Sequence, residues 1–391
     1  MITHIFNSSV VSGPETLVLP ALKHLGAPVT IVFLTETRLK DASLRPIEYA
    51  KSLGHEVHTV PVRGRYDRLA FSKLRDLLDQ LQPSVVHAHD VKASVYLLKA
   101  KLVRPGLTAS IVSTHHGASY RRGRIRLYEE FYVRRILPHF DLVLSVCEKD
   151  RLSIVKRGVL PNRVSLHLNG ADRRSVQVNL RDTLQGQIRS HWKESKQNLP
   201  DPDEAIFLGA VARLSPEKRH DRMVKVLMHL RKLYQSNPVK PILLFFGSGS
   251  EEQNLRKLVD KLGLRDSVFF MGYSNTISEE TAGFDLLLSL SDGEGIPINL
   301  LEAGWAGTPV VATRVGGIPD LISSSSEGIL VSPKEKNEAI AKMIFEALSN
   351  PSLLKNMGQA FQQRIRSDFS ETAWLDSLRV HYRTLSPAAT L

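Results

Sequence analysis

Short apolar runs alternate with longer amphipathic stretches in the first half of the chain. The runs have the length of strands and end in polar or glycine-containing turns, whereas the stretches between them follow the helical period. This alternation predicts an open, mostly parallel sheet covered by helices on both faces. The predicted strands are Thr3–Phe6, Val29–Leu34, Val57–Val60, Ser84–His87, Ser110–Ser113 and Leu142–Val146. The predicted helices are Pro14–Leu25, Asp67–Leu81 and Lys92–Leu102.

The second half repeats this plan, although the sequence itself contains no visible repeat. With 391 residues, the chain is long enough for two domains that each bury a core. Residues 173–204, between the halves, are polar, charged and punctuated by proline, which is typical of a linker with a surface helix. The predicted strands are Ile206–Val211, Ile242–Phe246, Val268–Met271, Leu286–Leu290 and Pro309–Thr313. The predicted helices include Pro216–Leu233, Glu251–Leu262 and a last helix near Glu371–Leu385.

The segment Asp285–Ile322 has the strongest functional signal. Its apolar run Leu286–Leu290 ends in the polar turn Ser291–Gly295. Pro297 can open a helix, because the first turn does not need the missing N–H, and Gly307 can close it. Strand, turn and helix in this order place a ligand site at the carboxyl end of a sheet, beside the positive end of a helix dipole.

Two carboxylates are expected to face this site, Glu294 in the turn and Glu302 on the helix. A glutamate in an early helical turn can also be a solvated residue that satisfies the helix dipole, so Glu302 alone is not diagnostic. The pair Gly316-Gly317 follows the next strand, and its backbone N–H groups could bind an anion.

Basic residues gather where the first strand of the second half leads into a helix. Ser215 is predicted to be the N-cap and Pro216 the first helical residue, which places Lys218 in the first turn. A cation there lowers the stability of the helix by a few tenths to about 1 kcal/mol, because the amino end of a helix is itself positive. Arg219 adds to this misfit. An anion such as a diphosphate, bound between the helix start, Arg213 and Lys218, would resolve it.

Glycine turns between a strand and a helix occur at two further places. Gly13 follows the first strand, and Gly247 begins a Gly-Ser-Gly turn in the second half. Glycine lets the backbone approach a phosphate closely at such helix starts. The pattern alone is weak, since a dinucleotide-binding protein would show it too. The segment Asn169–Asp172 is interpreted as a turn rather than a ligand site.

Histidines follow two predicted strands of the first half. His87 and His89 follow one, and His115-His116 the next, so all lie on the same rim of the sheet. Such pairs could ligate zinc, but the sequence offers no obvious carboxylate or cysteine partner. His89 fits a helix-start or supporting residue equally well.

Several of these motifs together resemble one family. The segments EGIPINLLEA, GTPVVAT and VGGIP are similar to the signature of retaining, nucleotide-sugar-dependent glycosyltransferases of the GT-B fold. RLSPEK resembles that family's G-R-L-x-x-E-K motif, with Ala212 in place of its glycine. Arg219 stands where the motif usually continues with glycine, and Ser12 replaces one of two glycines usual before the first helix.

The resemblance implies a fold and a division into domains. Two doubly wound Rossmann-like domains would face a central cleft, the first binding the acceptor and the second the donor. The last helix would cross back to pack on the first domain. The expected domains are 1–172, a linker over 173–204, a donor domain over 205–368 and the returning helix over 369–391.

The resemblance also implies a role for each site residue. Glu302 would hold the ribose hydroxyls, Arg213 and Lys218 the diphosphate, and Glu294 the sugar hydroxyls, while His116 would face the reaction centre. The catalytic residues expected are His116, Glu294, Arg213 and Lys218. The donor-binding residues expected are Gly13, Arg213, Lys218, Gly247, Glu294, Gly295, Ile296, Pro297 and Glu302. The reaction would transfer a hexose-type sugar to an acceptor hydroxyl with retention, and no metal or other cofactor is expected.

Net charge is the unusual bulk property, at +12. Residues 115–165 contain 11 basic and 5 acidic residues, which gives +6 (11 − 5), half of the total. In 121–135, arginines and aromatic residues fall within a few helical turns, as in a helix that lies on an anionic membrane. A solvated helix that packs on the sheet fits equally well. The partners expected are a nucleotide sugar, a carbohydrate or lipid-linked acceptor and an anionic membrane, and no nucleic-acid module appears.

Compartment and alternatives complete the hypothesis. The single Cys147 and the absence of a signal peptide fit the cytoplasm or the inner face of its membrane, with a role in lipopolysaccharide, polysaccharide or glycolipid synthesis.

One alternative is a nucleotide-sugar epimerase of the same fold, which would need no acceptor. A pyridoxal-type phosphorylase would need a Schiff-base lysine that the sequence does not identify. Another alternative is a non-catalytic basic scaffold on membranes, for which Glu294→Ala would leave function intact.

Overall fold

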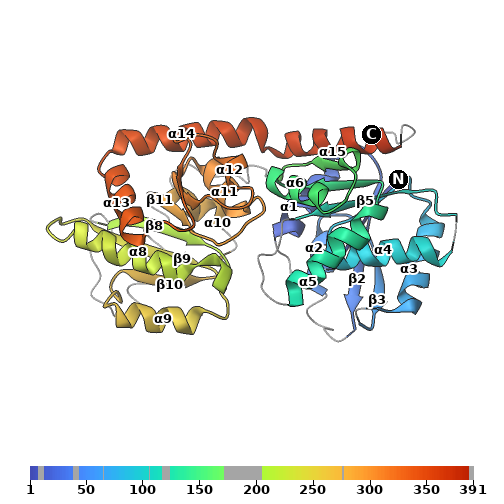
Figure 1. The fold of residues 1–391 in the computed structure, drawn as a ribbon, viewed down its shortest axis with the longest axis horizontal. Helices are drawn as coiled ribbons and strands as arrows, with labels where there is room; N and C mark the ends of the chain where they lie inside the picture. The colour runs from blue at the N-terminus through green and yellow to red at the C-terminus, as the bar shows by residue number, and fades with distance from the viewer. Residues whose placement is uncertain are drawn as a thin grey trace. The chain divides into compact units, whose positions relative to one another are not determined.

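The computed structural model describes residues 1–7, 13–37, 44–64, 66–104, 106–116, 124–170, 205–274 and 277–386 (Figure 1). The chain divides into two compact units. Unit 1 comprises Met1–Gly170 with Ser370–Leu391, and unit 2 comprises Ala171–Phe369. We describe each unit by itself.

Unit 1 is built on a seven-stranded sheet in which every pair is parallel, in the order β3-β2-β1-β4-β5-β6-β7. The strand order reverses between β1 and β4, which is where a doubly wound fold places its ligand crevice, at the carboxyl ends of the strands. The strands are β1 (Ile2–Phe6), β2 (Val29–Glu36), β3 (Glu56–Val62), β4 (Val85–Ala88), β5 (Ser110–His115), β6 (Leu142–Ser145) and β7 (Val164–Leu166).

Helices cover both faces of this sheet because its strands are apolar on both sides. One core joins the sheet to α3, α4 and the turns after α5 through residues such as Phe71, Leu97 and Tyr132. The other core joins it to α1, α2 and α15, with Trp374 and Tyr382 contributed by α15. The helices are α1 (Gly13–Ala21), α2 (Leu44–Ser52), α3 (Arg68–Leu81), α4 (Val91–Val103), α5 (Arg124–Phe131), α6 (Glu148–Lys156) and α15 (Glu371–Leu385).

Unit 2 contains a six-stranded parallel sheet in the order β10-β9-β8-β11-β12-β13, which reverses between β8 and β11. The strands are β8 (Ala205–Val211), β9 (Lys240–Phe246), β10 (Val268–Gly272), β11 (Leu286–Ser289), β12 (Val310–Thr313) and β13 (Ile329–Val331). The helices are α8 (His220–Leu233), α9 (Glu252–Lys261), α10 (Ile277–Glu280), α11 (Ile298–Ala306), α12 (Ile318–Leu321), α13 (Asn337–Leu348) and α14 (Pro351–Asp368).

The predicted fold class and all eleven predicted strands are confirmed. The edge strands β7 and β13 were not predicted, because runs of three residues are too short to stand out. Three helices, α2, α6 and the four-residue α10, were also missed. The α11 prediction is confirmed, since this helix follows Pro297 and ends at Gly307 in the left-handed conformation. None of the helices among the described residues is long and apolar enough to cross a membrane.

The predicted helix Pro216–Leu233 is wrong at its start. Residues Pro216–Lys218 form a separate 3-10 turn, and α8 begins only at His220. The break lies at Arg219, whose φ of 53° and ψ of 41° are left-handed and interrupt the helical ladder. Ser215 is the N-cap residue of this short turn and Pro216 its first residue, as predicted, but the Ser215 side chain makes no capping bond, since its hydroxyl donates to Glu217 Oε1 at 2.7 Å.

Some predictions concern residues outside the described ranges. These are the linker over 173–204, residues 121–123 of the basic segment, and Ser12, Ala171 and Asp172.

Candidate functional site

Lys218 and Glu294 form an ion pair at the carboxyl edge of the unit 2 sheet. Lys218 Nζ donates to Glu294 Oε1 at 2.6 Å and to Oε2 at 2.8 Å. The Ser291 hydroxyl donates to Glu294 Oε1 at 2.7 Å, and Thr313 in turn donates to the Ser291 carbonyl at 2.6 Å. The Glu294 and Lys218 side chains are only 10% and 23% exposed. Two residues that the sequence assigned to one ligand therefore lie in direct contact, although 76 positions separate them.

The basic residues after β8 already have acidic partners. Arg213, with a side chain 62% exposed, lies 3.4 Å from Glu217. Arg219 pairs with Asp221 at 3.1 Å and with Asp292 at 2.9 Å. The expected uncompensated cations at a helix start are therefore not present, because α8 starts later and carboxylates neutralise the arginines. The case for an anion site rests instead on where Lys218 and Arg213 lie.

Backbone hydrogen bonds join the loops that follow four neighbouring strands. The Leu214 N–H donates to the Ser248 carbonyl at 3.0 Å, which ties the loop after β8 to that after β9. The Asp292 N–H donates to the Glu217 carbonyl at 2.9 Å. The loop after β12 joins through the Gly317 N–H, which donates to the Gly295 carbonyl at 3.0 Å. The predicted site residues of unit 2 are thereby held on one rim of the sheet.

Two glycines on this rim are required by the backbone itself. Gly247 has a φ of 130°, and a Cβ there would lie 2.1 Å from the Ala212 carbonyl oxygen. Gly316 has a φ of 55°, and its Cβ would lie 1.6 Å from the Glu294 carbonyl oxygen. Both glycines therefore permit close packing between loops, and Gly316 directly supports the Glu294 backbone.

The amino end of α11 lies beside the ion pair. Gly295, Ile296 and Pro297 connect Glu294 to the helix, and the Asn299 side-chain amide donates to the Val211 carbonyl at 2.9 Å. This bond anchors the helix start to the end of β8. The first N–H groups of α11 have no partner within the helix, so they can bind an anion or a sugar hydroxyl. Glu302 lies further along α11 and is partly exposed.

His116 and Gly13 belong to unit 1. Gly13 begins α1, as predicted. His116 directly follows β5, and its ring is stacked on that of His89 with centroids 6.0 Å apart. Its Nε2 atom is buried and has no hydrogen-bond partner among the described residues, and burial lowers the pKa of the imidazole to about 4. A neutral imidazole with a free nitrogen can donate to or accept from a sugar hydroxyl.

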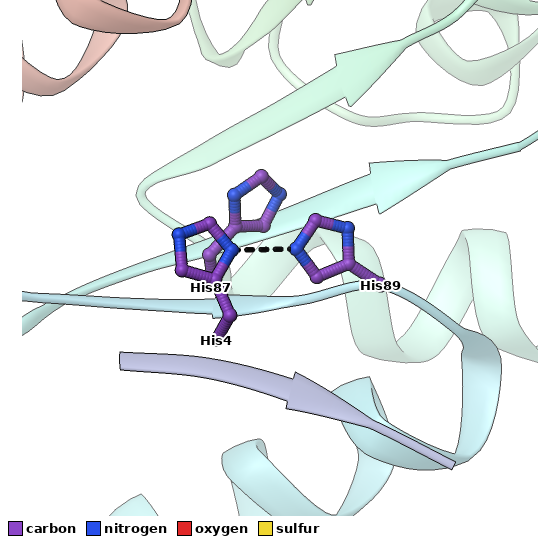
Figure 2. A group of neighbouring side chains, drawn as sticks. All are labelled: His4, His87 and His89. Atoms are coloured by element: carbon purple, nitrogen blue, oxygen red, sulfur yellow. Dashed lines mark hydrogen bonds between the residues drawn. The ribbon is translucent and has the colours of Figure 1, made fainter. Parts of the chain in front are cut away.

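Three buried imidazoles meet at the reversal of strand order between β1 and β4 (Figure 2). Nitrogen atoms of His4, His87 and His89 lie within 4.8 Å of one another. His4 Nδ1 and His89 Nε2 are hydrogen-bonded at 2.8 Å. Both nitrogens of His87 are occupied, by the Tyr382 hydroxyl at 2.6 Å and by the Thr114 hydroxyl at 2.7 Å.

Hydrogen bonds among the described residues hold this triad together. A divalent cation ligated by the three imidazoles would have to displace the His4–His89 bond and one of the two bonds that His87 makes. Sequence reasoning missed His4 and Tyr382, because an isolated histidine in a strand and a tyrosine on the last helix give no signal until β1 and β4 pair. Sequence reasoning also missed Ser291, Asp292 and Thr313, which support Glu294 and its loop.

Comparison with known proteins agrees with this arrangement. Residues 191–364 match the family model described as Glycosyl transferases group 1, and residues 16–174 match Glycosyltransferase Family 4. The chain is 33% identical over 200 residues to N-acetyl-alpha-D-glucosaminyl L-malate synthase of Bacillus anthracis. The aligned region covers 45% of this chain and 52% of that protein. It is 28% identical over 171 residues to poly(ribitol-phosphate) alpha-N-acetylglucosaminyltransferase of Staphylococcus aureus, covering 44% and 34%.

Solved structures share the whole fold. Anabaena HepE in complex with UDP superposes with a TM-score of 0.77 at 17% identity, covering 98% of this chain and 99% of that one. The same protein is also known in complex with UDP-glucose. The match to the two curated relatives, by contrast, spans only about half of their length or less.

Proposed function

This chain belongs to the glycosyltransferases of group 1 and family 4, with the GT-B fold, and we propose that it transfers a hexose-type sugar from a nucleotide-diphosphate donor to an acceptor hydroxyl with retention. The observation that carries the proposal is the Lys218–Glu294 pair on the rim of unit 2, beside Arg213 and the start of α11. This rim supplies cations, a carboxylate and free backbone N–H groups within one unit.

Each group has a role in the proposed reaction. The bond between the sugar's anomeric carbon and the diphosphate breaks, so negative charge develops on the leaving phosphate. Lys218, Arg213 and the amino end of α11 stabilise that charge, where fixed cations and dipoles contribute most. Glu294 accepts from sugar hydroxyls, and Glu302 accepts from the ribose hydroxyls.

The remaining roles in this proposal concern the acceptor side and cofactors. His116 contacts the transferred sugar, a role supported by its buried Nε2, which no described residue bonds. Gly13 and Gly247 let backbone approach the donor. The reaction proceeds without a metal, because Lys218 and Arg213 supply the positive charge at the diphosphate.

Donor binding changes the surroundings of the Lys218–Glu294 pair. The Lys218 ammonium has three N–H donors, two of which donate to the oxygens of Glu294, so a diphosphate can accept from the third and compete with Glu294 for the other two. The Glu294 carboxylate, still held by Ser291, then has an oxygen available for a sugar hydroxyl. A complete nucleotide sugar therefore satisfies both groups, whereas a nucleoside diphosphate satisfies Lys218 alone.

A cell-envelope acceptor is the substrate class we favour. The S. aureus relative is named for transfer of a sugar to poly(ribitol-phosphate). In this chain, α5 exposes Leu127, Tyr128 and Phe131 by 72%, 44% and 52%, and the adjoining Arg134 is also exposed. Apolar and basic side chains together are typical of a surface that meets an anionic membrane, where a lipid-linked acceptor would lie.

Vesicle binding tests the membrane part of the proposal. Wild type should co-sediment with phosphatidylglycerol vesicles at low salt and be released as salt screens the arginines. Phe131→Asp should weaken this binding, whereas Leu160→Asp, at a leucine 55% exposed elsewhere in unit 1, should not. Absence of binding at low salt would refute the membrane surface and leave the donor site unaffected.

Thermal stability against a panel of UDP-, GDP-, ADP-, CDP- and dTDP-sugars tests the donor site. A ligand at about 100 times its dissociation constant should add roughly 2.7 kcal/mol to the free energy of unfolding. One nucleotide class should stabilise wild type but neither Arg213→Ala nor Glu302→Ala. Stabilisation by none of them would refute the proposed function. Conversion of a bound nucleotide sugar without any acceptor would instead identify an epimerase.

A further inference from the structure

Arg219 occupies a backbone conformation that few side chains adopt. Among the described residues, only Arg219 and Gln82 are non-glycine residues with positive φ. The left-handed conformation is less favourable for a residue with a Cβ than for glycine. Glycine would therefore be the usual residue here, so the presence of an arginine must be explained by what its side chain does.

The left-handed turn at Arg219 separates Lys218 from α8. The Arg219 carbonyl accepts the first bonds of α8, from the Arg222 N–H at 2.9 Å and the Met223 N–H at 3.3 Å. Lys218 consequently lies in its own short turn and can reach across to Glu294.

The Arg219 side chain joins the two loops that carry the predicted donor ligands. Its Nε donates to Asp221 Oδ1 at 3.1 Å on its own element, and its Nη1 donates to Asp292 Oδ1 at 2.9 Å on the loop after β11. Asp292 is held from the other side as well, since its N–H donates to the Glu217 carbonyl at 2.9 Å. Arg219 is next to Lys218, and Asp292 is two residues before Glu294.

Three contacts thus connect these loops, and they differ in what a donor would do to them. The Lys218–Glu294 pair consists of two groups that the donor uses in the proposed reaction, so the ligand competes for this contact. The Asp292–Glu217 backbone bond and the Arg219–Asp292 pair use no group that the donor needs. Two carboxylates already neutralise the Arg219 guanidinium, so it is poorly suited to bind the diphosphate itself.

We propose that Arg219 is a positioning residue, which acts through Asp292 to keep Lys218 and Glu294 in register while the donor replaces their mutual contact. The inference rests on the proposed function. Misplacement of a reacting group by about 1 Å can reduce a rate by as much as a hundredfold, so even a weak surface pair matters if it fixes this register.

Arg219→Gly removes the ion pair and Asp292→Asn removes its negative charge, with little damage to the fold. Glycine relieves the backbone strain at this position, which partly offsets the loss of two partly exposed ion pairs. Asparagine keeps the size of Asp292 and its N–H bond to Glu217. Arg265→Ala, which removes an exposed arginine paired with Asp260 elsewhere in unit 2, is the matched control.

The assay measures UDP release from UDP-glucose and the affinity for UDP, with the other nucleotides of the panel substituted if one of them binds better. We expect Arg219→Gly, Asp292→Asn and the double variant to lower kcat by the same factor, about tenfold, with KM changed less than threefold and the melting temperature unchanged. Arg219→Lys should recover part of kcat, and Arg265→Ala should match wild type.

Three results would overturn the inference. If kcat in the double variant fell by the product of the two single factors, the two residues would act independently. Loss of UDP affinity in Arg219→Gly but not in Asp292→Asn would show that Arg219 contacts the nucleotide. A normal kcat in both single variants would show that the pair is dispensable. A wild type that binds no nucleotide sugar refutes the donor site itself, which is a separate failure.

Discussion

Mild acid should destabilise unit 1, because its buried histidines are folded in the neutral form. Burial lowers the pKa of His4 to about 3 and that of His167 to about 3, with neighbouring imidazoles adding to the effect. His87 and His89 are lowered well below their usual value for the same reasons. In the unfolded chain these rings have a pKa of about 6.5. The unfolded state therefore binds more protons than the folded state as pH falls.

The sign and size follow from proton linkage. The contribution that each neutral ring makes to the free energy of unfolding is fully present above about pH 7. It is lost progressively from pH 6.5 down to the folded pKa near 3. At pH 5 each ring costs 1.36 × 1.5, or about 2 kcal/mol. His4 and His167 together then remove about 4 kcal/mol, a large part of the 5–15 kcal/mol typical of a folded domain. The melting temperature should fall by roughly 8–16 °C between pH 7.5 and 5.

Hydrogen exchange between pH 7.5 and 5, corrected for the intrinsic exchange rate, measures this loss on peptides from β1, β4 and α15, and calorimetry gives the melting temperature. His167→Asn keeps a group that can bond the Ser377 hydroxyl, now 3.1 Å from His167 Nδ1, but cannot titrate, so it should reduce the expected loss by about 2 kcal/mol, the share of one ring. His139→Asn, at an exposed imidazole of the same unit, is the control. A loss below 1 kcal/mol for unit 1 in wild type would refute the reasoning, because it would mean that the rings accept protons without cost.

Three further predictions concern unit 2. Gly316→Ala should lower the free energy of unfolding by more than 2 kcal/mol in urea titrations. Gly263→Ala, also at positive φ but with open space around it, should lower it by only about 1 kcal/mol. Equal losses in the two variants would mean that the loops do not pack closely. Arg222→Met should cost about 2–3 kcal/mol, because the buried guanidinium donates to the Glu335 carbonyl at 2.6 Å, and a cost near zero would show that water replaces this bond. Glu294→Gln should keep its contact with Ser291 and lose at least tenfold in kcat/KM with a nucleotide sugar; unchanged turnover would favour the non-catalytic scaffold.

The sequence by itself determined the strands, their order along the chain and the family. Each of these depends on local information, such as apolar runs of four or more residues or the spacing from Glu294 to Glu302. It failed where the local signal was short or misleading. The three-residue strands β7 and β13 carry too few apolar residues to be distinguished from loops. The continuous pattern after Pro216 hid the break at Arg219, because helical periodicity does not report a single left-handed residue.

Only the tertiary structure decided which charges neutralise one another and which histidines meet. Lys218 contacts Glu294, which lies 76 positions further along the chain, and Arg219 contacts Asp292, which lies 73 positions further. His4 meets His89 only because β1 pairs with β4, and Tyr382 joins them from the last helix. Such contacts depend on strand order and on close packing of loops. A local pattern contains neither, so the sequence could indicate the site residues but not their partners.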